Sequence, residues 1–501
     1  AVVVWQESAR SSAATWLKTK PSSTPTAPLP SQPSPKALIA LHKQVASSLH
    51  GTQKRYYLLD TPDDPYYASS WYLQNINAPS AWATTNSSSG VTVAVIDSGF
   101  ALNHQDLSGQ WAANPGESGD GKETDGIDND NNGYIDDYRG WDFVTNDNTP
   151  QAGTLNSAGV GVSHGTETAG LVGATSNNGL GVSSVSRGTK LLPLQVMDDN
   201  GSGYSDDVAQ AIIYAIDQGA DIISMSLGTS GDDPQVRAAV DLAFQSNVLV
   251  VAAAGNCGNN SLGACSGQPA GYVTFPANYD RVVAVGASDS NNNRASFSSY
   301  GERLDIMAPG AGSIRSTTWT SGNGTSAYTT TLNGTSYSAP IVASTAALIR
   351  SIRPTTSIDD LRTLLMASTN KVSPMSGAFY SQSYGHGLLN VGKAVQIASE
   401  LNTSGEAQPS LQQTGGPAAD HLYASSDVLG ARCNTTALTW CSVWLRNDAS
   451  SYDRFLPYQK ADANGVASWG FTASGLNKGE WSSRARQGDI VSIIPYMLLK
   501  K

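Results

Sequence analysis

Short apolar runs alternate with amphipathic stretches between roughly residues 61 and 400 of this chain. The runs cover residues 91–96, 191–197, 221–227, 248–254 and 282–287. Between them, residues 205–218 and 233–245 carry apolar side chains at helical spacing and open on residue types that cap helices. Continuous Val, Ile and Leu runs separated by helices predict an α/β fold with a mostly parallel sheet covered by helices on both faces. Because ligands of such sheets bind beyond the carboxyl ends of the strands, functional residues are expected there.

The pattern changes on both sides of this region. Residues 21–35 read PSSTPTAPLPSQPSP, and their six prolines favour an extended linker within an N-terminal extension, residues 1–60. Residues 401–501 show little helical periodicity and predict a small β-rich domain after the α/β domain at 61–400. The tryptophans of this last part, Trp440, Trp444, Trp469 and Trp481, fit core packing or, less commonly, capture of a polymer or cell surface.

Composition excludes several classes of partner. Only 14% of the residues are charged, below the roughly 25% usual for soluble domains, which suits an extracellular enzyme. The formal net charge of -11, with no basic stripe, argues against a nucleic-acid partner. No apolar stretch reaches the roughly 18 to 20 residues of a membrane helix, so no membrane span is expected. No export signal stands near Ala1, and we expect that any such signal was removed or lies outside this sequence.

The four cysteines form two pairs of equal spacing. They are Cys257 with Cys265 and Cys433 with Cys441. Each pair encloses a short loop rich in Gly, Asn, Thr or Ser, which predicts two local disulfides and an oxidising compartment. A zinc site would need more clustered ligands than six scattered histidines offer, and reduced thiols remain the alternative.

Four polar residues stand at the ends of predicted elements. Asp97 closes the run at 91–96, His164 opens the segment HGTETAG, Ser336 precedes an apolar helical stretch, and Asn256 follows the run at 248–254. Each residue alone is equally typical of a cap or a turn. A serine hydroxyl becomes a nucleophile only when a base takes its proton and a third group holds that base. The set therefore predicts Ser336 as nucleophile, His164 as general base, Asp97 as its orienting carboxylate and Asn256 as an amide donor.

Five motifs, VIDSG, HGTETAG, SMSLG, AAAGN and GTSYSAP, follow one another in the order found in subtilisin-like serine proteases. Over about residues 61–400 the chain resembles this subtilase family, whose triad order Asp, His, Ser differs from that of chymotrypsins and α/β-hydrolases. The resemblance implies a serine endopeptidase that works through an acyl-enzyme intermediate. It also implies an oxyanion hole made by the Asn256 amide and the Ser336 backbone N–H.

The resemblance further implies how a protein or peptide substrate binds to a monomeric enzyme. The substrate would add a strand between two enzyme edges. These edges are Gly201, Gly203 and Tyr204 on one side and Ser226, Leu227 and Gly228 on the other. The floor of the first side-chain pocket is expected near Thr274, with a broad preference for apolar or aromatic residues. The family usually carries an inhibitory prosegment, and residues 1–60 are either a remnant of one or an unrelated segment that leaves on maturation near residue 60.

Two departures from the family pattern stand beside the catalytic residues. Tyr337 and Ser338 occupy positions where many relatives have Met and Ala, so we expect little inactivation by mild peroxide. Glu167 stands where a second His is common, which we interpret as tolerated packing. It does not indicate sedolisin chemistry, because His164 is present. The alternative function, a binding protein on a silent protease scaffold, is disfavoured because such relics typically lose a triad member and none is lost here.

Residues 120–142 hold eight acidic residues against Lys122 and Arg139. Such a run is usually a solvated loop, but this one has the oxygen spacing of an EF-hand-like calcium site. The expected ligands are Asp128, Asp130, Asn132, the Tyr134 carbonyl, and either Asp136 or Asp137 as the closing carboxylate. By the family resemblance, Asp64, Asp106 and Asn178 match a second calcium site. We expect Ca²⁺ to be structural, with no cofactor needed for the chemistry.

Overall fold

The computed structural model describes residues 61–499 apart from short gaps. The gaps are residues 86–87, 154–161, 260–262, 321–323, 402–409, 416–421, 424–427, 435–439, 448–451, 465, 473–478 and 488–489. The predicted extension at residues 1–60, with its linker, lies outside the described residues. All described residues belong to one compact unit, Tyr57–Lys501.

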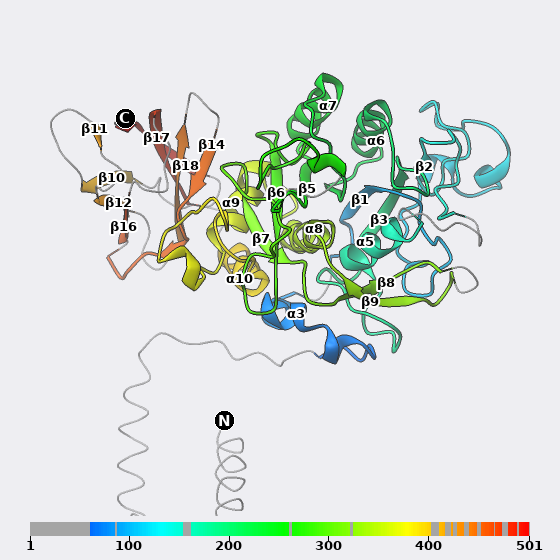
Figure 1. Ribbon diagram of the computed structural model, residues 1–501, viewed down its shortest axis with the longest axis horizontal. Helices are drawn as coiled ribbons and strands as arrows, with labels where there is room; N and C mark the ends of the chain where they lie inside the picture. Colours follow the sequence, from blue (N-terminus) through cyan, green and yellow to red (C-terminus); the bar gives the residue numbers. More distant parts are fainter. Residues whose placement is uncertain are drawn as a thin grey trace, which may run out of the picture. The chain divides into compact units, whose positions relative to one another are not determined.

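A sheet of seven parallel strands lies at the centre, in the order β2-β3-β1-β4-β5-β6-β7 (Figure 1). The strands are β1 (Thr92–Asp97), β2 (Trp141–Asp142), β3 (Lys190–Gln195), β4 (Ile222–Met225), β5 (Leu249–Ala253), β6 (Val282–Ser288) and β7 (Ile306–Pro309). The five predicted runs correspond to β1, β3, β4, β5 and β6, so the prediction of a parallel sheet is confirmed. The edge strands β2 and β7, of two and four residues, were not predicted, because neither lies within a continuous apolar run such as the one that contains β4.

Helices cover both faces of this sheet. The principal ones are α5 (His164–Gly173), α6 (Ser205–Asp217), α7 (Pro234–Gln245), α8 (Thr335–Ile352), α9 (Ile358–Ala367) and α10 (Val391–Glu400). Alternate residues of β1 enter different cores: Val93 and Val95 pack with α5, α8 and α10, whereas Ala94 and Ile96 pack with α6 and α7. The predicted helices at 205–218 and 233–245 are α6 and α7 (Figure 1).

Shorter elements surround the sheet. They are α3 (Trp71–Asn75), α4 (Ala78–Trp82), the antiparallel pair β8 (Ile314–Thr317) and β9 (Tyr328–Leu332), and the 3₁₀ turns η1 (Tyr67–Ser69), η2 (Pro115–Glu117), η3 (Lys122–Thr124), η4 (Gly263–Cys265) and η5 (Ser373–Met375). Hydroxyls of β8 bind carbonyls of α5: Ser316 Oγ donates to Glu167 O at 2.6 Å and Thr317 Oγ1 to Thr166 O at 2.7 Å. These bonds hold the first turn of α5 against β8.

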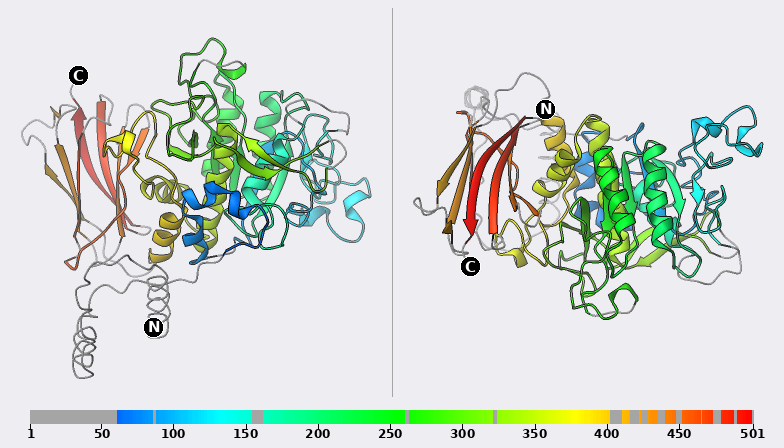
Figure 2. Two further views of the ribbon diagram at one scale, coloured as in Figure 1. Left: turned by 60° about the horizontal axis from the view of Figure 1, so that its bottom comes forward. Right: turned by 90° about the horizontal axis from the view of Figure 1, so that it is seen from above.

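The C-terminal region consists of strands, as predicted (Figure 2). They are β10 (Ser410–Gly415), β11 (Leu422–Tyr423), β12 (Val428–Asn434), β13 (Trp440–Asn447), β14 (Tyr452–Phe455), β15 (Gln459–Lys460), β16 (Val466–Thr472), β17 (Gly479–Gln487) and β18 (Ile490–Leu499). Its described tryptophan side chains are packed: Trp469 Nε1 donates to Pro457 O at 2.7 Å, and Trp440 Nε1 to Glu400 at 2.9 Å. The Trp444 and Trp481 side chains lie outside the described residues.

Candidate active site

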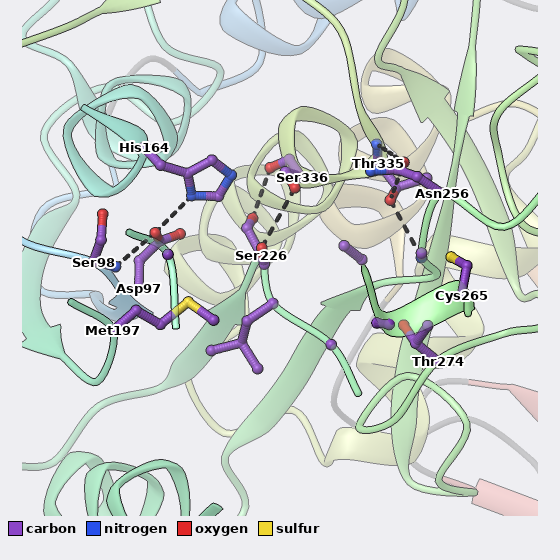
Figure 3. A pocket seen from close by; sticks show the side chains of 16 residues that line it. Asp97, Ser98, His164, Met197, Ser226, Asn256, Cys265, Thr274, Thr335 and Ser336 are labelled. Carbon is purple, nitrogen blue, oxygen red and sulfur yellow. Dashed lines mark hydrogen bonds and ion pairs between the residues drawn. The ribbon is translucent and has the colours of Figure 1, made fainter. Parts of the chain in front are cut away.

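The four predicted catalytic residues line one cavity at the carboxyl edge of the sheet (Figure 3). Asp97 is the last residue of β1, His164 the first residue of α5, and Ser336 the second residue of α8. Asn256 follows the end of β5. The parallel sheet therefore brings together residues that are far apart in the sequence, because all its strands end at the same edge.

The Asp97 carboxylate is buried and fully partnered. Its Oδ1 lies 2.7 Å from Nδ1 of His164 and also accepts the Ser98 amide at 2.7 Å. Its Oδ2 accepts the hydroxyl of Thr168 at 3.1 Å, one turn further along α5 than His164. The bond to Nδ1 leaves Nε2 of the imidazole on the side of Ser336 (Figure 3).

Opposing effects act on the imidazole of His164. Burial lowers its pKa, but the charge and hydrogen bond of Asp97 and the charge of Glu167 raise it more, to about 9. The surroundings therefore stabilise the imidazolium, the form that arises when this ring accepts a proton.

Ser336 lies at the start of α8, an 18-residue helix whose first amides face the cavity edge. It forms a reciprocal pair with Ser226: Ser226 Oγ donates to Ser336 O at 2.6 Å, and Ser336 Oγ donates to Ser226 O at 3.4 Å. The hydroxyl thus points to Ser226 rather than to His164. Without substrate, nucleophile-to-base hydrogen bonds are often long or misaligned.

Asn256 is oriented by Thr335, a residue that the sequence analysis did not single out. Asn256 Oδ1 accepts the Thr335 amide at 3.1 Å and the Thr335 hydroxyl at 3.0 Å. With the oxygen held in this way, the Nδ2 amide is left to donate elsewhere. The available signal was the motif GTS itself, whose Thr immediately precedes Ser336.

The predicted substrate-binding residues divide between two adjoining cavities. Gly201, Ser226, Leu227, Gly228 and Thr274 line the cavity of the catalytic residues. Gly203 and Tyr204 line the second one, which shares Met197, Leu227 and Gly228 with the first. Tyr204 is 80% exposed. A Cβ on Gly228 would come within 2.5 Å of Thr274 Oγ1, so the glycine is needed where the edge passes the buried threonine.

A disulfide forms part of the cavity wall. Cys257 and Cys265 are bonded, and Cys265 lines the cavity beside Ala264. Cys257 directly follows Asn256 in the sequence, and this adjacency could have predicted that the disulfide lies at the cavity. Cys441 is also disulfide-bonded, whereas the side chain of its predicted partner Cys433 lies outside the described residues.

The acidic loop brings together only some of its predicted ligands. Asp128 and Asp130 converge with Glu117 of η2, so that one carboxylate oxygen of each lies within 4.8 Å of the others. Glu117 is fully buried, its Oε1 accepts the Asn129 and Asp130 amides, and its Oε2 has no hydrogen-bond partner. The sequence analysis missed Glu117 because it lies outside the EF-hand-like spacing.

The remaining predicted ligands of this loop are engaged in other ways. Asn132 Oδ1 accepts the Tyr134 amide, and the Tyr134 ring packs against Trp141 and Tyr214. Asp136 turns away and accepts the Gly126 amide at 3.0 Å. Asp137 is buried, where it accepts the Tyr214 hydroxyl at 2.6 Å and the side-chain amides of Asn114 and Asn132. Burial raises the pKa of Asp137, and these hydrogen bonds oppose that rise.

The second predicted calcium group is assembled around a tight loop. Asn178 Nδ2 donates to Asp106 Oδ1 at 2.9 Å, and the amides of Asn177 and Asn178 donate to Asp64. Asp64 and Asp106 are both buried. The structure thus places all three predicted residues in one hydrogen-bonded cluster.

The chain is similar in sequence to known proteins. Residues 88–387 match the profile of the Subtilase family. Thermitase from Thermoactinomyces vulgaris is 34% identical over 337 residues, which cover 67% of this chain and 99% of thermitase. Subtilisin DY from Bacillus licheniformis is 37% identical over 321 residues, which cover 64% of this chain and 96% of subtilisin DY.

A solved protease structure from Pseudoalteromonas arctica is also similar in fold. It is 28% identical, with a TM-score of 0.53, and the match covers 68% of this chain and all of that one. Among the described residues, no helix has the length and apolar composition needed to cross a bilayer.

Proposed function

Because the chain belongs to the subtilase family and is a serine endopeptidase, we propose that Asp97, His164 and Ser336 are its catalytic triad. The observation that carries this proposal is the 2.7 Å contact between the buried Asp97 carboxylate and Nδ1 of His164, at the cavity that Ser336 also lines. A carboxylate in this place fixes the tautomer in which Nε2 accepts a proton.

The proposed reaction follows from the positions of these groups. His164 Nε2 takes the proton from Ser336 Oγ as the oxygen attacks the scissile carbonyl, and an acyl-enzyme forms when the amine leaves with that proton. The negative charge that develops on the carbonyl oxygen is stabilised by Asn256 Nδ2 and the Ser336 backbone N–H. Thr335 supports this role, because it holds Oδ1 of Asn256 and thereby fixes the amide plane.

We propose that substrate binds as an extended strand between the edges at Gly201–Tyr204 and Ser226–Gly228. Backbone pairing of this kind supplies affinity with little demand on sequence. The first pocket ends on the buried Thr274, and apolar side chains such as Val208, Phe275 and Tyr279 line the neighbouring cavity. A broad preference for apolar or aromatic substrate residues follows.

We propose that the acidic loop binds a structural Ca²⁺ at Glu117, Asp128 and Asp130, with Asn132 and the Tyr134 carbonyl as neighbouring oxygen donors. The buried, unpartnered Oε2 of Glu117 supports a cation at this point, since an isolated buried carboxylate oxygen is costly. Oxygen-only ligands on a flexible loop suit Ca²⁺. Asp64, Asp106 and Asn178 are proposed as a second site. Neither ion takes part in the chemistry.

The cysteine usage supports secretion into an oxidising compartment. We propose a monomeric, secreted enzyme that matures by loss of residues 1–60, with its catalytic domain at 61–400 and a β-rich domain at 401–501. N-terminal sequencing of the active form tests the maturation point.

An active-site-directed fluorophosphonate tests the triad. We expect stoichiometric labelling of Ser336 in the mature protein, and loss of both labelling and casein hydrolysis in Ser336→Ala. Ser338→Ala is the matched control, because that buried hydroxyl donates to Ala308 O and Pro309 O and should leave labelling intact. Hydrolysis that persists in Ser336→Ala would overturn the assignment.

A further inference from the structure

A second buried carboxylate lies beside the proposed triad. Glu167 is three residues after His164 on α5, so both side chains lie on the same face of that helix. Its side chain is only 6% exposed. A carboxylate this deeply buried is costly unless its oxygens are hydrogen-bonded, which makes its partners informative.

Both oxygens of Glu167 have hydroxyl partners from other elements. Oε1 accepts the hydroxyl of Thr318, which directly follows β8, at 2.8 Å. Oε2 accepts the hydroxyl of Tyr337 at 2.8 Å. Tyr337 is the residue after Ser336 on α8, and its ring lies 5.8 Å from the imidazole of His164, centroid to centroid. The carboxylate therefore links the helix that carries the base to the helix that carries the nucleophile.

We infer that Glu167 is a positioning residue of the active site, which holds Tyr337 and faces the imidazole of His164 as a second anion beside Asp97. The inference rests on the proposed triad and adds two residues to it. It replaces the interpretation of Glu167 as tolerated packing, because the carboxylate joins the helix of His164 to the helix of Ser336.

The titratable side chains that interact with His164 come from three elements. Asp97 lies on β1, Glu167 on α5 and Tyr337 on α8. Burial raises the pKa of the Tyr337 phenol, and the neighbouring Glu167 carboxylate raises it further, so the ring stays neutral and donates. Two anions thus act on the imidazolium: Asp97, which is hydrogen-bonded to the ring, and Glu167, whose charge adds a smaller rise in the pKa of His164.

Two variants separate the charge of Glu167 from its hydrogen bond. In Glu167→Gln the second anion is lost, so the pKa of His164 should fall. The acid limb of the pH profile, where kcat/KM rises as His164 loses its proton, should therefore move by about one pH unit toward acid. In Tyr337→Phe the charge remains and only the link between the helices is lost. We expect that variant to lose kcat several-fold at every pH while its acid limb stays at the wild-type position.

Glu123→Gln is the matched control, because it removes the same charge from a half-buried position on the acidic loop that does not line the cavity of His164 and Ser336. Its acid limb should coincide with that of the wild type. If the acid limb of Glu167→Gln also coincides with the wild type, or if Glu123→Gln shifts it equally, the inference is wrong. Rescue of the wild-type limb in Glu167→Asp supports the role of the charge.

Should Glu167→Gln not accumulate as folded protein, the double variant Thr318→Val with Tyr337→Phe removes both hydroxyl partners and keeps the charge. A several-fold loss of kcat is expected there, and an unchanged kcat overturns the positioning role. Failure of the triad itself is recognised separately, because Ser336→Ala would then retain hydrolysis whatever Glu167→Gln does.

Discussion

Buried carboxylates differ in their hydrogen-bond partners between the active site and the acidic loop. In the active site, Asp97 and Glu167 have a hydrogen-bond donor at every oxygen. In the loop, Glu117 is equally buried but keeps one oxygen without a hydrogen-bond partner, and one oxygen of its carboxylate lies within 4.8 Å of carboxylate oxygens of Asp128 and Asp130. The protein itself supplies hydrogen-bond donors to the carboxylates of the active site. The carboxylates of the loop repel one another unless a cation binds between them.

This difference separates catalysis from stability. An active site whose carboxylates are already partnered is preorganised and needs no ion. A loop with an unpartnered buried carboxylate gains its stability from whatever binds there. Variants of the active site should therefore change rates without changing the response to calcium, and variants of the loop should do the reverse.

The largest effect is expected for Asp97→Asn. An amide at this place would favour the wrong imidazole tautomer and remove the negative charge, and the expected loss in kcat is about 10⁴-fold. The fall in melting temperature on adding EDTA should equal that of the wild type. A loss of less than ten-fold would contradict the role of Asp97 as the orienting carboxylate.

Calcium removal should have the next largest effect. Ca²⁺ at one hundred times its Kd stabilises a folded protein by about 2.7 kcal/mol per site, so EDTA should lower the melting temperature by several degrees. Ca²⁺ should restore it, and Mg²⁺ should do so poorly because it demands stricter octahedral geometry. Calorimetry with and without EDTA measures this, and superimposable melting curves would remove both proposed sites.

The two regions also differ in how far the sequence alone predicts them. Asp97 ends an apolar strand, whereas His164 and Ser336 begin helices, so the order of strands and helices along the chain placed them at one sheet edge. The short strands β2 and β7 offered no such pattern. The Glu167–Tyr337 bond joins positions 170 apart in the sequence, and no periodicity connects them.

The acidic loop was predicted by spacing, and spacing assigns ligands only when the backbone follows the expected path. Asp136 has a positive φ of 55°, and its carboxylate turns to the Gly126 amide instead of closing the site. Glu117 reaches the cluster from a separate 3₁₀ turn, which a contiguous motif cannot reveal.

A smaller effect is expected for Tyr214→Phe, which tests the anchor between the loop and α6. The Tyr214 hydroxyl donates to the buried Asp137 carboxylate at 2.6 Å, and hydrogen bonds to charged groups contribute about 1.5–3 kcal/mol. Chemical denaturation should show a loss in this range, of equal size with Ca²⁺ and with EDTA. A loss that vanishes in EDTA would instead indicate that Asp137 acts as a calcium ligand.

The smallest and sharpest effect is expected for Glu117→Gln. In EDTA the neutral amide should relieve the repulsion and donate to Asp128 or Asp130, which raises the free energy of unfolding by about 1 kcal/mol. With Ca²⁺ the variant should be less stable than the wild type, because it lacks one negative charge among the calcium ligands. Glu123→Gln is the control, since its exposed carboxylate accepts the Gly119 amide in the same loop and should show no such reversal. If Glu117→Gln is less stable than the wild type in EDTA as well, Oε2 of Glu117 makes a stabilising contact of its own, and the contrast between the two regions does not hold.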